Sequence, residues 1–540
     1  MYLTQGLHRS RRHSPDQPAT IFGDRVRSIA EQADRVARLA GGLRSLGVAD
    51  GERVAILGLN SDRYVDLLFA IPWANGIVNP LNFRWHPSEM AYALRDSDTS
   101  ILVVDDTFAP MVPELLDGHP GLCAVVLAAD GPPPEGALHY EDLMDVAPPI
   151  CDARRGGEAV AAVMYTGGTT GQPKGVALTH ANLLTSVLGT QATCPVVRPG
   201  GRVLHAAPLF HMLGLHTWAS QSIVGGTHVV VPRFDPDEVM VAIEQHRVTS
   251  IVVVPTMLQA LVDHPGRATY DLSSVTTLAY GASPVTESLL QRAMEAFPHA
   301  DFIQVYGMTE LGSISALTHE DHRRGDRLRS AGRTAAHAEV RVVDEDGVEV
   351  PRGTVGEIAA RGGNVMAGYW GQPDATAAAV RDGWLHTGDA AYMDDDGYIF
   401  IVDRIKDMII TGGENVYSVE VENALGRHPA VAACAVIGLP DATWGERVHA
   451  VVRPRPDVEV TPDELIRHTR GLVAAYKAPR SVELVDTLPL SGAGKVLKRE
   501  LRARFVDSGG GDQVATGDGS RGSITDHDQR RGWEPTAGRS

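Results

Sequence analysis

The residues best suited to bind phosphate are concentrated in one segment, Tyr165-Thr-Gly-Gly-Thr-Thr-Gly-Gln-Pro-Lys-Gly175. Glycine has no Cβ and lets the backbone approach a ligand, while threonine hydroxyls and a lysine ammonium add donors and positive charge. A glycine-rich turn alone would explain the glycines but not the hydroxyls or the lysine. The segment therefore predicts a phosphate-binding loop. Its candidate ligands are Thr166, Gly167, Gly168, Thr169, Thr170, Gly171 and Lys174.

The loop does not match the P-loop of nucleotide triphosphatases. A P-loop has Gly-Lys-Ser/Thr, with a helix that begins at the lysine. Here Lys174 stands between Pro173 and Gly175, and Pro-Lys-Gly does not begin a helix in that way. P-loop NTPases are thereby excluded.

Lysine is rare in this chain, because only five of its 49 basic residues are lysines. An ammonium on a flexible stem makes point-charge contacts that a planar guanidinium does not make. Chance explains the retention of one lysine, but less well that of several lysines within motifs. The five are Lys174, Lys406, Lys477, Lys495 and Lys498.

The composition predicts an acidic multidomain protein of the cytoplasm. A chain of 540 residues suggests about two to four domains. Its net charge of −18 argues against nucleic acid or an anionic membrane as the main partner. Four widely spaced cysteines fit a reducing compartment and form no C-x-x-C pair. We find no signal-peptide core and no apolar run long enough to cross a bilayer, so we expect no integral membrane association.

The first four hundred residues are typical of an α/β fold. Strand-like and helical segments alternate from Ala19 to about Asp105, which predicts a mostly parallel sheet covered on both faces. Later apolar strands are predicted at 251–254, 275–279 and 302–305. Ligands of such sheets bind at the carboxyl ends of the strands, so we expect the segments that follow these strands to line one crevice with the loop. Those segments begin at Pro255, Tyr280 and Tyr306.

The pattern of apolar and turn-forming residues changes from about Val340, where short strands with Asp-Gly and Arg-Gly turns predict a small antiparallel unit. A charged break at Asp403–Asp407 separates this unit from a last stretch with predicted helices at 418–425 and 462–473 and strands at 432–437 and 448–452. We predict an N-terminal domain at 1–403, a hinge at 404–407, an α+β domain at 408–506 and a disordered tail at 507–540.

Five motifs, in order, resemble those of the adenylate-forming enzymes, which include acyl-CoA synthetases, peptide-synthetase adenylation domains and firefly-type luciferases. The resemblance covers roughly residues 20 to 505. It implies the acyl-adenylate synthetase fold, a large N-terminal domain followed by a small mobile C-terminal one. The motifs are Tyr165–Gly175, Tyr306–Glu310, Thr387–Asp389, Asp403–Asp407 with Gly412–Asn415, and Leu488–Lys498.

The resemblance implies two half-reactions. A carboxylic acid and ATP give an acyl-adenylate and pyrophosphate, and a nucleophile such as coenzyme A then displaces AMP. In the first step two anions approach each other, so the site needs cations and fixed donors at the α-phosphate. Mg²⁺ is the implied counter-ion of ATP.

By the same resemblance, the loop holds the β- and γ-phosphates, and Glu310, with Thr166, binds Mg²⁺. Thr309 touches the α-phosphate, and Tyr306, which Gly307 follows, stacks on adenine. Asp389 accepts hydrogen bonds from the ribose hydroxyls with the support of Arg404. The alternatives are a solvated loop carboxylate for Glu310, core packing for Tyr306, and a surface ion pair for Asp389 and Arg404.

Lys495 is the implied catalytic residue of the first step, because it could bridge the attacking carboxylate and the α-phosphate. Lys406 matches the hinge position of the family, although an exposed linker lysine is the alternative. After a domain rotation the segment with Gly412, Gly413 and Asn415 faces the incoming thiol. Lys498 is interpreted as a structural or phosphate-facing neighbour of Lys495.

The acyl side is the least specific part of the pattern. His211 occupies the place of a residue that flanks the acyl pocket in the family, either as a gate or as a packed core histidine. Gly281, Ala282 and Ser283 are expected to line the pocket, and the two small residues leave space there. We find no charge suited to the ammonium of an amino acid, which favours a fatty, aryl or other apolar acid.

Two positions depart from the family pattern. Gly167 replaces a frequent serine, and Ser418 replaces a frequent proline. The leading interpretation is an acid–CoA ligase. The alternative is a synthetase that passes the acyl group to an amine or to a carrier-protein thiol, and a homodimer is left open. A luciferase-like oxygenase and a non-catalytic nucleotide-binding regulator are the less favoured readings.

Overall fold

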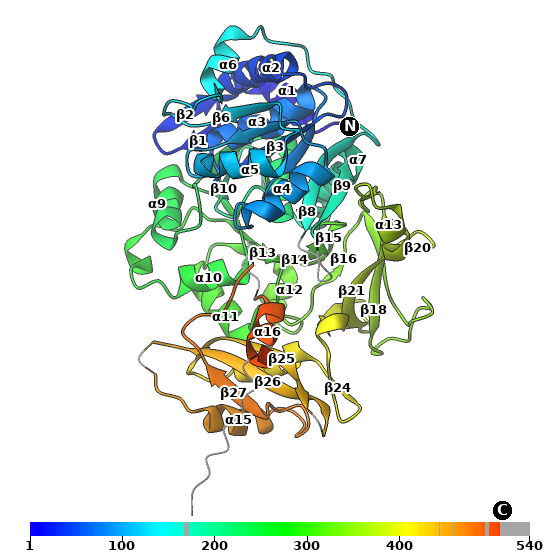
Figure 1. Ribbon diagram of the computed structural model, residues 1–540. Helices are drawn as coiled ribbons and strands as arrows, with labels where there is room; N and C mark the ends of the chain where they lie inside the picture. The colour runs from blue at the N-terminus through cyan, green and yellow to red at the C-terminus, as the bar shows by residue number, and fades with distance from the viewer. Residues whose placement is uncertain (167–171, 442, 457, 492–495, 508–540) are drawn as a thin grey trace, which may run out of the picture.

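The structure is a computed structural model that describes residues 1–166, 172–441, 443–456, 458–491 and 496–507. Four β-sheets and the helices packed against them make up this part of the chain. Three of the sheets form a large body that extends to Arg404, and the fourth belongs to a smaller unit at one end of that body (Figure 1). The predicted α/β architecture is confirmed. The predicted disorder of the tail concerns residues that, apart from Asp507, lie outside the described ones.

Sheet A has nine strands in the order β16-β15-β14-β13-β12-β10-β11-β1-β2. Its strands from β10 to β14 run parallel, so the carboxyl ends of β12, β13 and β14 open at one edge, as predicted. The strands are β1 Pro18–Phe22, β2 Arg25–Ser28, β10 Arg202–His205, β11 Thr227–Val230, β12 Ser250–Val253, β13 Thr277–Gly281, β14 Asp301–Met308, β15 Gly312–Leu317 and β16 Arg333–Thr334.

Sheet B has eight strands in the order β19-β9-β8-β4-β3-β5-β6-β7. The parallel strands β3 and β5 are almost wholly buried, which explains their continuous apolar sequence. The strands are β3 Arg53–Leu57, β4 Ile77–Pro80, β5 Ile101–Val104, β6 Ala124–Leu127, β7 Leu138–His139, β8 Val160–Thr166, β9 Lys174–Thr179 and β19 Gly368–Tyr369.

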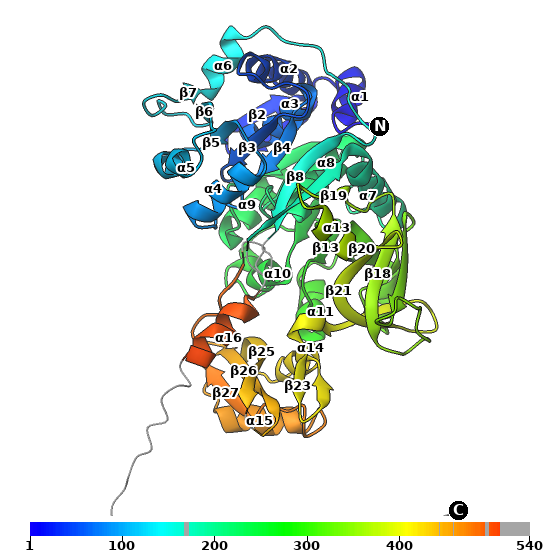
Figure 2. The same cartoon turned by 45° about the vertical axis from the view of Figure 1, so that its right-hand side comes forward.

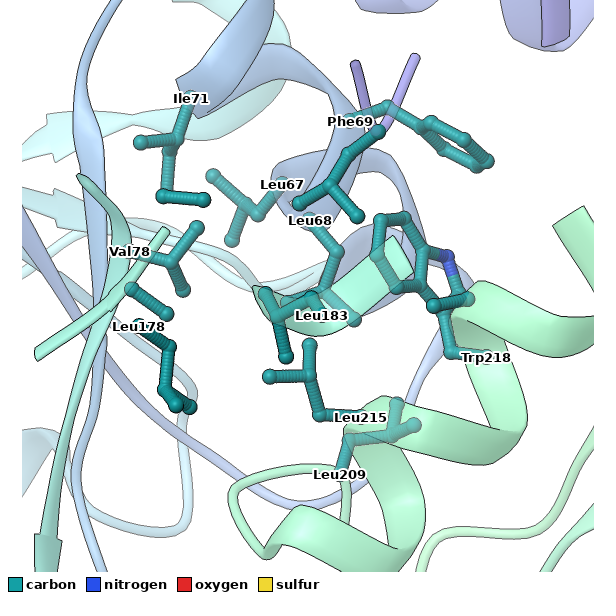
Figure 3. Packing of buried hydrophobic residues seen from close by; sticks show 14 of the residues in the cluster. Leu67, Leu68, Phe69, Ile71, Val78, Leu178, Leu183, Leu209, Leu215 and Trp218 are labelled. Atoms are coloured by element: carbon teal, nitrogen blue, oxygen red, sulfur yellow. The ribbon is translucent and has the colours of Figure 1, made fainter. Parts of the chain in front are cut away.

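Three helices lie between sheets A and B and hold them together. α3 contacts β4 of sheet B and β1 of sheet A, and α7 contacts β9 and β15, while α8 packs on α7, β10 and β11. Figure 3 shows the apolar side chains where these helices meet, among them the fully buried Trp218, whose ring meets Phe69 edge-on at 4.8 Å. Burial of a large apolar side chain contributes about 1.5–3 kcal/mol, so this core fixes the strand ends of the two sheets relative to each other.

Polar caps begin several helices. Ser28 and Glu31 form a reciprocal capping box at α2, and Thr318 and Asp321 form another at α12. The helices of the body, including the 3₁₀ turns η1 and η2, are α1 Gln5–His13, α2 Ile29–Ser45, α3 Asp62–Trp73, α4 Pro87–Asp96, η1 Ala109–Met111, α5 Val112–Gly118, α6 Tyr140–Val146, α7 His180–Thr193, α8 Met212–Val224, α9 Pro236–His246, α10 Pro255–Val262, η2 Arg267–Thr269, α11 Glu287–Ala296, α12 His319–Arg324 and α13 Pro373–Ala379.

Sheet C is the predicted antiparallel unit, and sheet D forms the core of the smaller unit (Figure 2). Between β22 and β23 the chain passes from one sheet to the other through a 3₁₀ turn, η3 Ile405–Asp407. Sheet C contains β17 Ala338–Val343, β18 Gly356–Gly362, β20 Val380–Arg381, β21 Trp384–Met393 and β22 Ile399–Arg404. Sheet D contains β23 Ile409–Thr411, β24 Glu414–Val416, β25 Val431–Asp441, β26 Gly445–Pro454 and β27 Ser481–Leu484.

The helices of the smaller unit are α14 Ser418–Leu425, α15 Pro462–Arg470 and α16 Lys498–Asp507. The sequence predicts the second of these to reach Val473, but it ends earlier because the Gly471 N–H turns back to the carbonyls of Arg467 and His468 in a tight last turn. Contacts between residues far apart in the chain tie the unit to the body. The Arg84 Nη1 donates to the Ser491 carbonyl at 3.0 Å, and Arg455 lies 3.7 Å from the Asp263 carboxylate.

Candidate functional site

The segment predicted to bind phosphate joins two antiparallel strands rather than a strand and a helix. β8 and β9 pair with each other, and Thr166 lies opposite Lys174. Lys174 thus begins a strand, which agrees with the exclusion of a P-loop. The predicted ligands at 167–171 lie outside the described residues.

Glu310 lies in the turn between β14 and β15, and a residue outside its motif holds its side chain in place. The Tyr369 hydroxyl donates to Glu310 Oε1 at 3.0 Å, and Lys174 Nζ lies 5.0 Å from the centre of the Tyr369 ring. Glu310 is only 7% exposed, so it is not the solvated loop carboxylate of the alternative interpretation. Tyr369 was missed by sequence reasoning, because a lone tyrosine in a short edge strand gives no pattern.

Tyr306, at the other end of the segment Tyr306–Glu310, belongs to a second group of polar side chains. The Tyr306 hydroxyl donates to Asp389 Oδ2 at 2.6 Å, and Arg404 Nε lies 2.5 Å from Asp389 Oδ1. Burial and the Asp389 carboxylate raise the pKa of Tyr306 well above its ordinary range, so the hydroxyl stays protonated and acts as a donor. Because Asp389 is buried, the alternative interpretation of Asp389 and Arg404 as a surface ion pair is excluded.

The turn that presents Asp389 is held by two residues that the motif does not contain. Glu357 accepts a hydrogen bond from the Gly388 N–H at 2.8 Å through one oxygen and contacts His386 Nδ1 at 2.7 Å through the other. Gly388 has φ +72°, a conformation that favours glycine. The backbone thus determines where the Asp389 carboxylate lies.

Gly281 is the last residue of β13 and lies opposite Val305 of β14, and Ala282 and Ser283 follow it. A Cβ at position 281 would lie 2.3 Å from the Val305 carbonyl oxygen, so only glycine fits there. Ala282 has φ +70°, which is rare for a residue with a side chain and is a form of strain that gathers at functional sites. Gly307 is equally constrained, because a Cβ would meet the Gly312 carbonyl at 1.8 Å.

His211 directly precedes α8 and is partly exposed. Its ring lies 5.2 Å from that of Phe210, which meets Phe83 edge-on at 5.0 Å. An aromatic cluster therefore lies beside the residue that the family pattern assigns to the acyl pocket. Whether His211 acts as a gate stays a prediction.

The residues predicted to serve the second half-reaction lie in the smaller unit or at its edge. Lys406 is exposed within η3, and Gly412, Gly413 and Asn415 are exposed at the β23–β24 turn. Gly412 lets the ring of Trp444 come close, since a Cβ there would lie 2.8 Å from it. Among the contacts between described residues, none joins this turn to Glu310 or Asp389.

Lys495 lies outside the described residues, but both ends of its loop are defined. Leu490 and Val496 form an antiparallel bridge, and the Leu497 N–H donates to the Pro489 carbonyl at 2.9 Å. Ser491 contacts Arg84 of the body, as described above. The two described ends of this segment therefore lie side by side, and the first of them contacts the body at Arg84.

Lys498 has structural partners within the smaller unit. Its Nζ lies 2.7 Å from Glu422 Oε1 and 2.5 Å from Ser418 Oγ. The Ser418 N–H donates to Asp403 Oδ2 at 2.5 Å, so Ser418 connects α14 to the end of β22. This agrees with the structural interpretation of Lys498, and proline at position 418 would remove the N–H donor.

The donor set around Glu310 fits a magnesium ion that is held mainly by ATP. Among the described residues, no group of three or more His, Cys, Asp or Glu side chains could hold a metal by itself. Mg²⁺ commonly binds through one or two carboxylates together with substrate phosphates and water. The buried carboxylate of Glu310, whose partner Tyr369 lies beside Lys174, is compatible with that arrangement.

Together, the β8–β9 hairpin, the buried carboxylates Glu310 and Asp389 and the smaller C-terminal unit are the arrangement expected for the class of adenylate-forming enzymes. The chain matches the model of AMP-binding enzymes over residues 7–370 and that of their C-terminal domain over residues 420–495. It belongs to the AMP-binding enzyme family.

Three known proteins show the range of activities among its relatives. Feruloyl-CoA synthase of Amycolatopsis sp is 43% identical over 92% of this chain and 98% of its own length. The anthranilate CoA ligase AuaEII, solved with anthranoyl-AMP, is 28% identical with a TM-score of 0.88 and covers 93% of this chain and 97% of its own. The amide bond synthetase McbA of Marinactinospora thermotolerans is 31% identical with a TM-score of 0.84 over 93% and 99%.

No helix among the described residues is long and apolar enough to cross a membrane.

Proposed function

We propose that the chain is an ATP-dependent carboxylic acid–CoA ligase that works through an acyl-adenylate. The observation that carries the proposal is the segment Tyr306–Glu310. Its first residue contacts Asp389, which also pairs with Arg404, and this group suits a ribose. Its last residue contacts Tyr369 beside Lys174, which suits a polyphosphate. One nucleoside triphosphate could occupy both ends.

In the first half-reaction, Asp389 accepts hydrogen bonds from the ribose hydroxyls while Lys174 and the loop at 166–171 bind the β- and γ-phosphates. Mg²⁺ held by Glu310, with Thr166 as a further ligand, supplies neutralisation of the phosphate charge. An oxygen of the acid attacks the α-phosphorus, and the bond to pyrophosphate breaks. Lys495 places its ammonium between the two anions, where positive charge lowers the barrier most.

In the second half-reaction, the thiolate of coenzyme A attacks the acyl carbon, and AMP leaves with the electron pair of the C–O bond. We propose residues 404–407 as the hinge between a nucleotide- and acid-binding domain at 1–403 and a C-terminal domain at 408–506. The change of sheet between β22 and β23 supports this division. Rotation about Lys406 would bring Gly412, Gly413 and Asn415 to the acyl group in place of Lys495.

The acid is proposed to be an aryl or arylalkenyl acid. The aromatic cluster beside His211 suits a planar ring, and Gly281 and Ala282 add little bulk. The feruloyl and anthranilate specificities of two relatives support the same class. The four cysteines are unpaired, which supports a reducing cytoplasm as the location.

A second candidate function is amide synthesis, since the solved structure of McbA is also closely similar. The two functions share adenylation and differ in the acceptor. Both predict acid-dependent exchange of pyrophosphate into ATP.

The test is a pyrophosphate-exchange screen over aryl, fatty and amino acids, followed by addition of CoA or amines with the best acid. We expect exchange with aryl acids and thioester formation with CoA. Product with amines alone would overturn the ligase assignment in favour of amide synthesis, and no exchange with any acid would contradict adenylation itself.

A further inference from the structure

Tyr369 lies between Glu310 and Lys174, the two charged residues that we propose to serve the polyphosphate of ATP. It belongs to β19, which pairs antiparallel with β9, so that Tyr369 lies opposite Val176. The backbone on both sides is also fixed, because Trp370 N–H donates to the Gly175 carbonyl at 2.7 Å and Met366 N–H donates to the Glu310 carbonyl at 2.8 Å. The segment 366–370 therefore joins the Glu310 turn to the strand that begins with Lys174.

The side chain of Tyr369 contacts both charges with different atoms. Its hydroxyl donates to Glu310 Oε1, and its ring face lies 5.0 Å from the Lys174 ammonium. A cation over a ring face is attracted by the ring quadrupole, and a hydrogen bond to a carboxylate is stronger than one between neutral groups. A phenol is protonated at neutral pH, so the hydroxyl is a donor to the carboxylate.

This arrangement fixes one oxygen of Glu310 and the ammonium of Lys174 with a single rigid side chain. The orientation of a carboxylate determines which of its lone pairs a metal ion meets, and partners of a ligand commonly tune metal affinity. An ammonium held over a ring keeps its charge directed toward an anion instead of moving freely on its flexible stem.

We propose that Tyr369 is a positioning residue that orients Glu310 through its hydroxyl and Lys174 through its ring for the magnesium-bound polyphosphate of ATP. This inference rests on the proposed function. It assigns Tyr369 to the adenylation half-reaction, and it separates the task of the hydroxyl from that of the ring.

The first experiment compares Tyr369→Phe, which keeps the ring and loses the hydroxyl, with the wild type. We expect the Mg²⁺ concentration for half-maximal pyrophosphate exchange to rise about tenfold or more, the effect of losing one charge-assisted hydrogen bond. The rise in melting temperature caused by ATP should shrink when Mg²⁺ is present and change little in EDTA. Thioester formation from supplied acyl-adenylate should be unchanged, because that substrate has no polyphosphate.

Three further variants make the outcome decisive. Tyr392→Phe is the matched control, because Tyr392 stacks on Phe400 in sheet C and contacts neither Glu310 nor Lys174 among the described contacts. Tyr369→Leu removes the ring as well and should also weaken pyrophosphate binding. In a Glu310→Gln background, Tyr369→Phe should have little further effect, because the hydroxyl acts through that carboxylate.

The proposal is overturned if Tyr369→Phe keeps the wild-type Mg²⁺ dependence, or if both half-reactions fall equally, as they would for a general structural role. It is also overturned if Tyr369→Phe and Glu310→Gln have additive effects. Failure of the proposed function looks different, since the wild type would then show no acid-dependent exchange. If Tyr369→Phe is too unstable to assay, the Mg²⁺-dependent ATP shift of Tyr369→Leu, which also lacks the hydroxyl, decides in the same way.

Discussion

Asp389 shows how one buried carboxylate can be prepared for two vicinal hydroxyls. Tyr306 and Arg404 contact different oxygens of the carboxylate, and the turn behind it is fixed through Glu357. Each oxygen still has lone-pair capacity for a hydroxyl donor. The carboxylate is therefore oriented before a nucleotide arrives.

We predict that Asp389→Asn raises the KM for ATP by about 10- to 100-fold, the effect of losing charge-assisted hydrogen bonds, while the KM for CoA stays unchanged. Steady-state kinetics with varied ATP measure this. The control is Asp396→Asn, because Asp396 is 67% exposed and pairs with Arg327 at the surface. Equal KM values for ATP in the two variants would contradict the assignment of Asp389 to the ribose.

At the scale of elements, α14 and α16 are joined to the end of β22 by Lys498, Ser418 and Asp403. A lysine that contacts a carboxylate and a hydroxyl in a largely buried setting is costly to remove, because the remaining carboxylate loses its compensation. The same helix α14 offers a comparison, since Glu420 pairs with Lys477 at 2.8 Å at a more exposed position.

We predict that Lys498→Met lowers the unfolding free energy of the C-terminal unit by about 2–4 kcal/mol, whereas Lys477→Met lowers it by at most about 1 kcal/mol. Urea unfolding followed by a probe in that unit measures both. Equal losses in the two variants would show that the cluster of Lys498, Ser418 and Asp403 gives no special stability.

At the scale of the whole molecule, the site depends on two units, because Lys495 is separated from Lys174 by more than three hundred residues. We predict that Lys495→Ala abolishes adenylate formation while thioester formation from supplied acyl-adenylate is largely retained. The two half-reactions are assayed separately, with Arg499→Ala as a control for loss of a nearby exposed cation. An equal loss of both half-reactions would contradict the assignment of Lys495 to the first step.

Stability should also depend on pH through buried histidines of the body. His205 Nε2 and His228 Nδ1 lie 2.9 Å apart, and burial lowers the pKa of His205 to about 3 and that of His228 well below its ordinary value. Because their folded pKa values are lowered, the stability is present above the unfolded pKa of about 6.5. It is lost as the pH falls toward the folded values, since only the unfolded chain then binds protons.

We predict that the unfolding free energy falls by about 1.4 kcal/mol per pH unit for each of these histidines between about pH 6 and 5. Denaturation midpoints at several pH values measure the slope. His205→Asn should reduce the slope, and His13→Asn, at an exposed position, should not. Identical slopes in all three proteins would rule out the His205–His228 pair as the cause.

Much of the fold is predictable from the sequence, because apolar runs and turn-forming residues indicate strands and turns from a few neighbouring residues. The apolar strands before Pro255 and Tyr280, and the turn-rich texture after Val340, predict parallel and antiparallel sheets that the structure contains. Helix α14 has the predicted limits at Ser418 and Leu425. The end of α15 differs from the prediction, because it is set by the hydrogen bonds of the Gly471 N–H to the carbonyls of Arg467 and His468.

The kind of chemistry is predictable from the sequence, because hydroxyls, glycines, carboxylates and rare lysines occur in five motifs in order. Which side chains hold those groups in place depends on the tertiary structure. Tyr369, Glu357 and Arg84 come from segments with no motif, and they reach the site through sheet pairing and domain contact. Contacts between residues far apart in the chain depend on how strands pair and helices pack, and no local pattern encodes them.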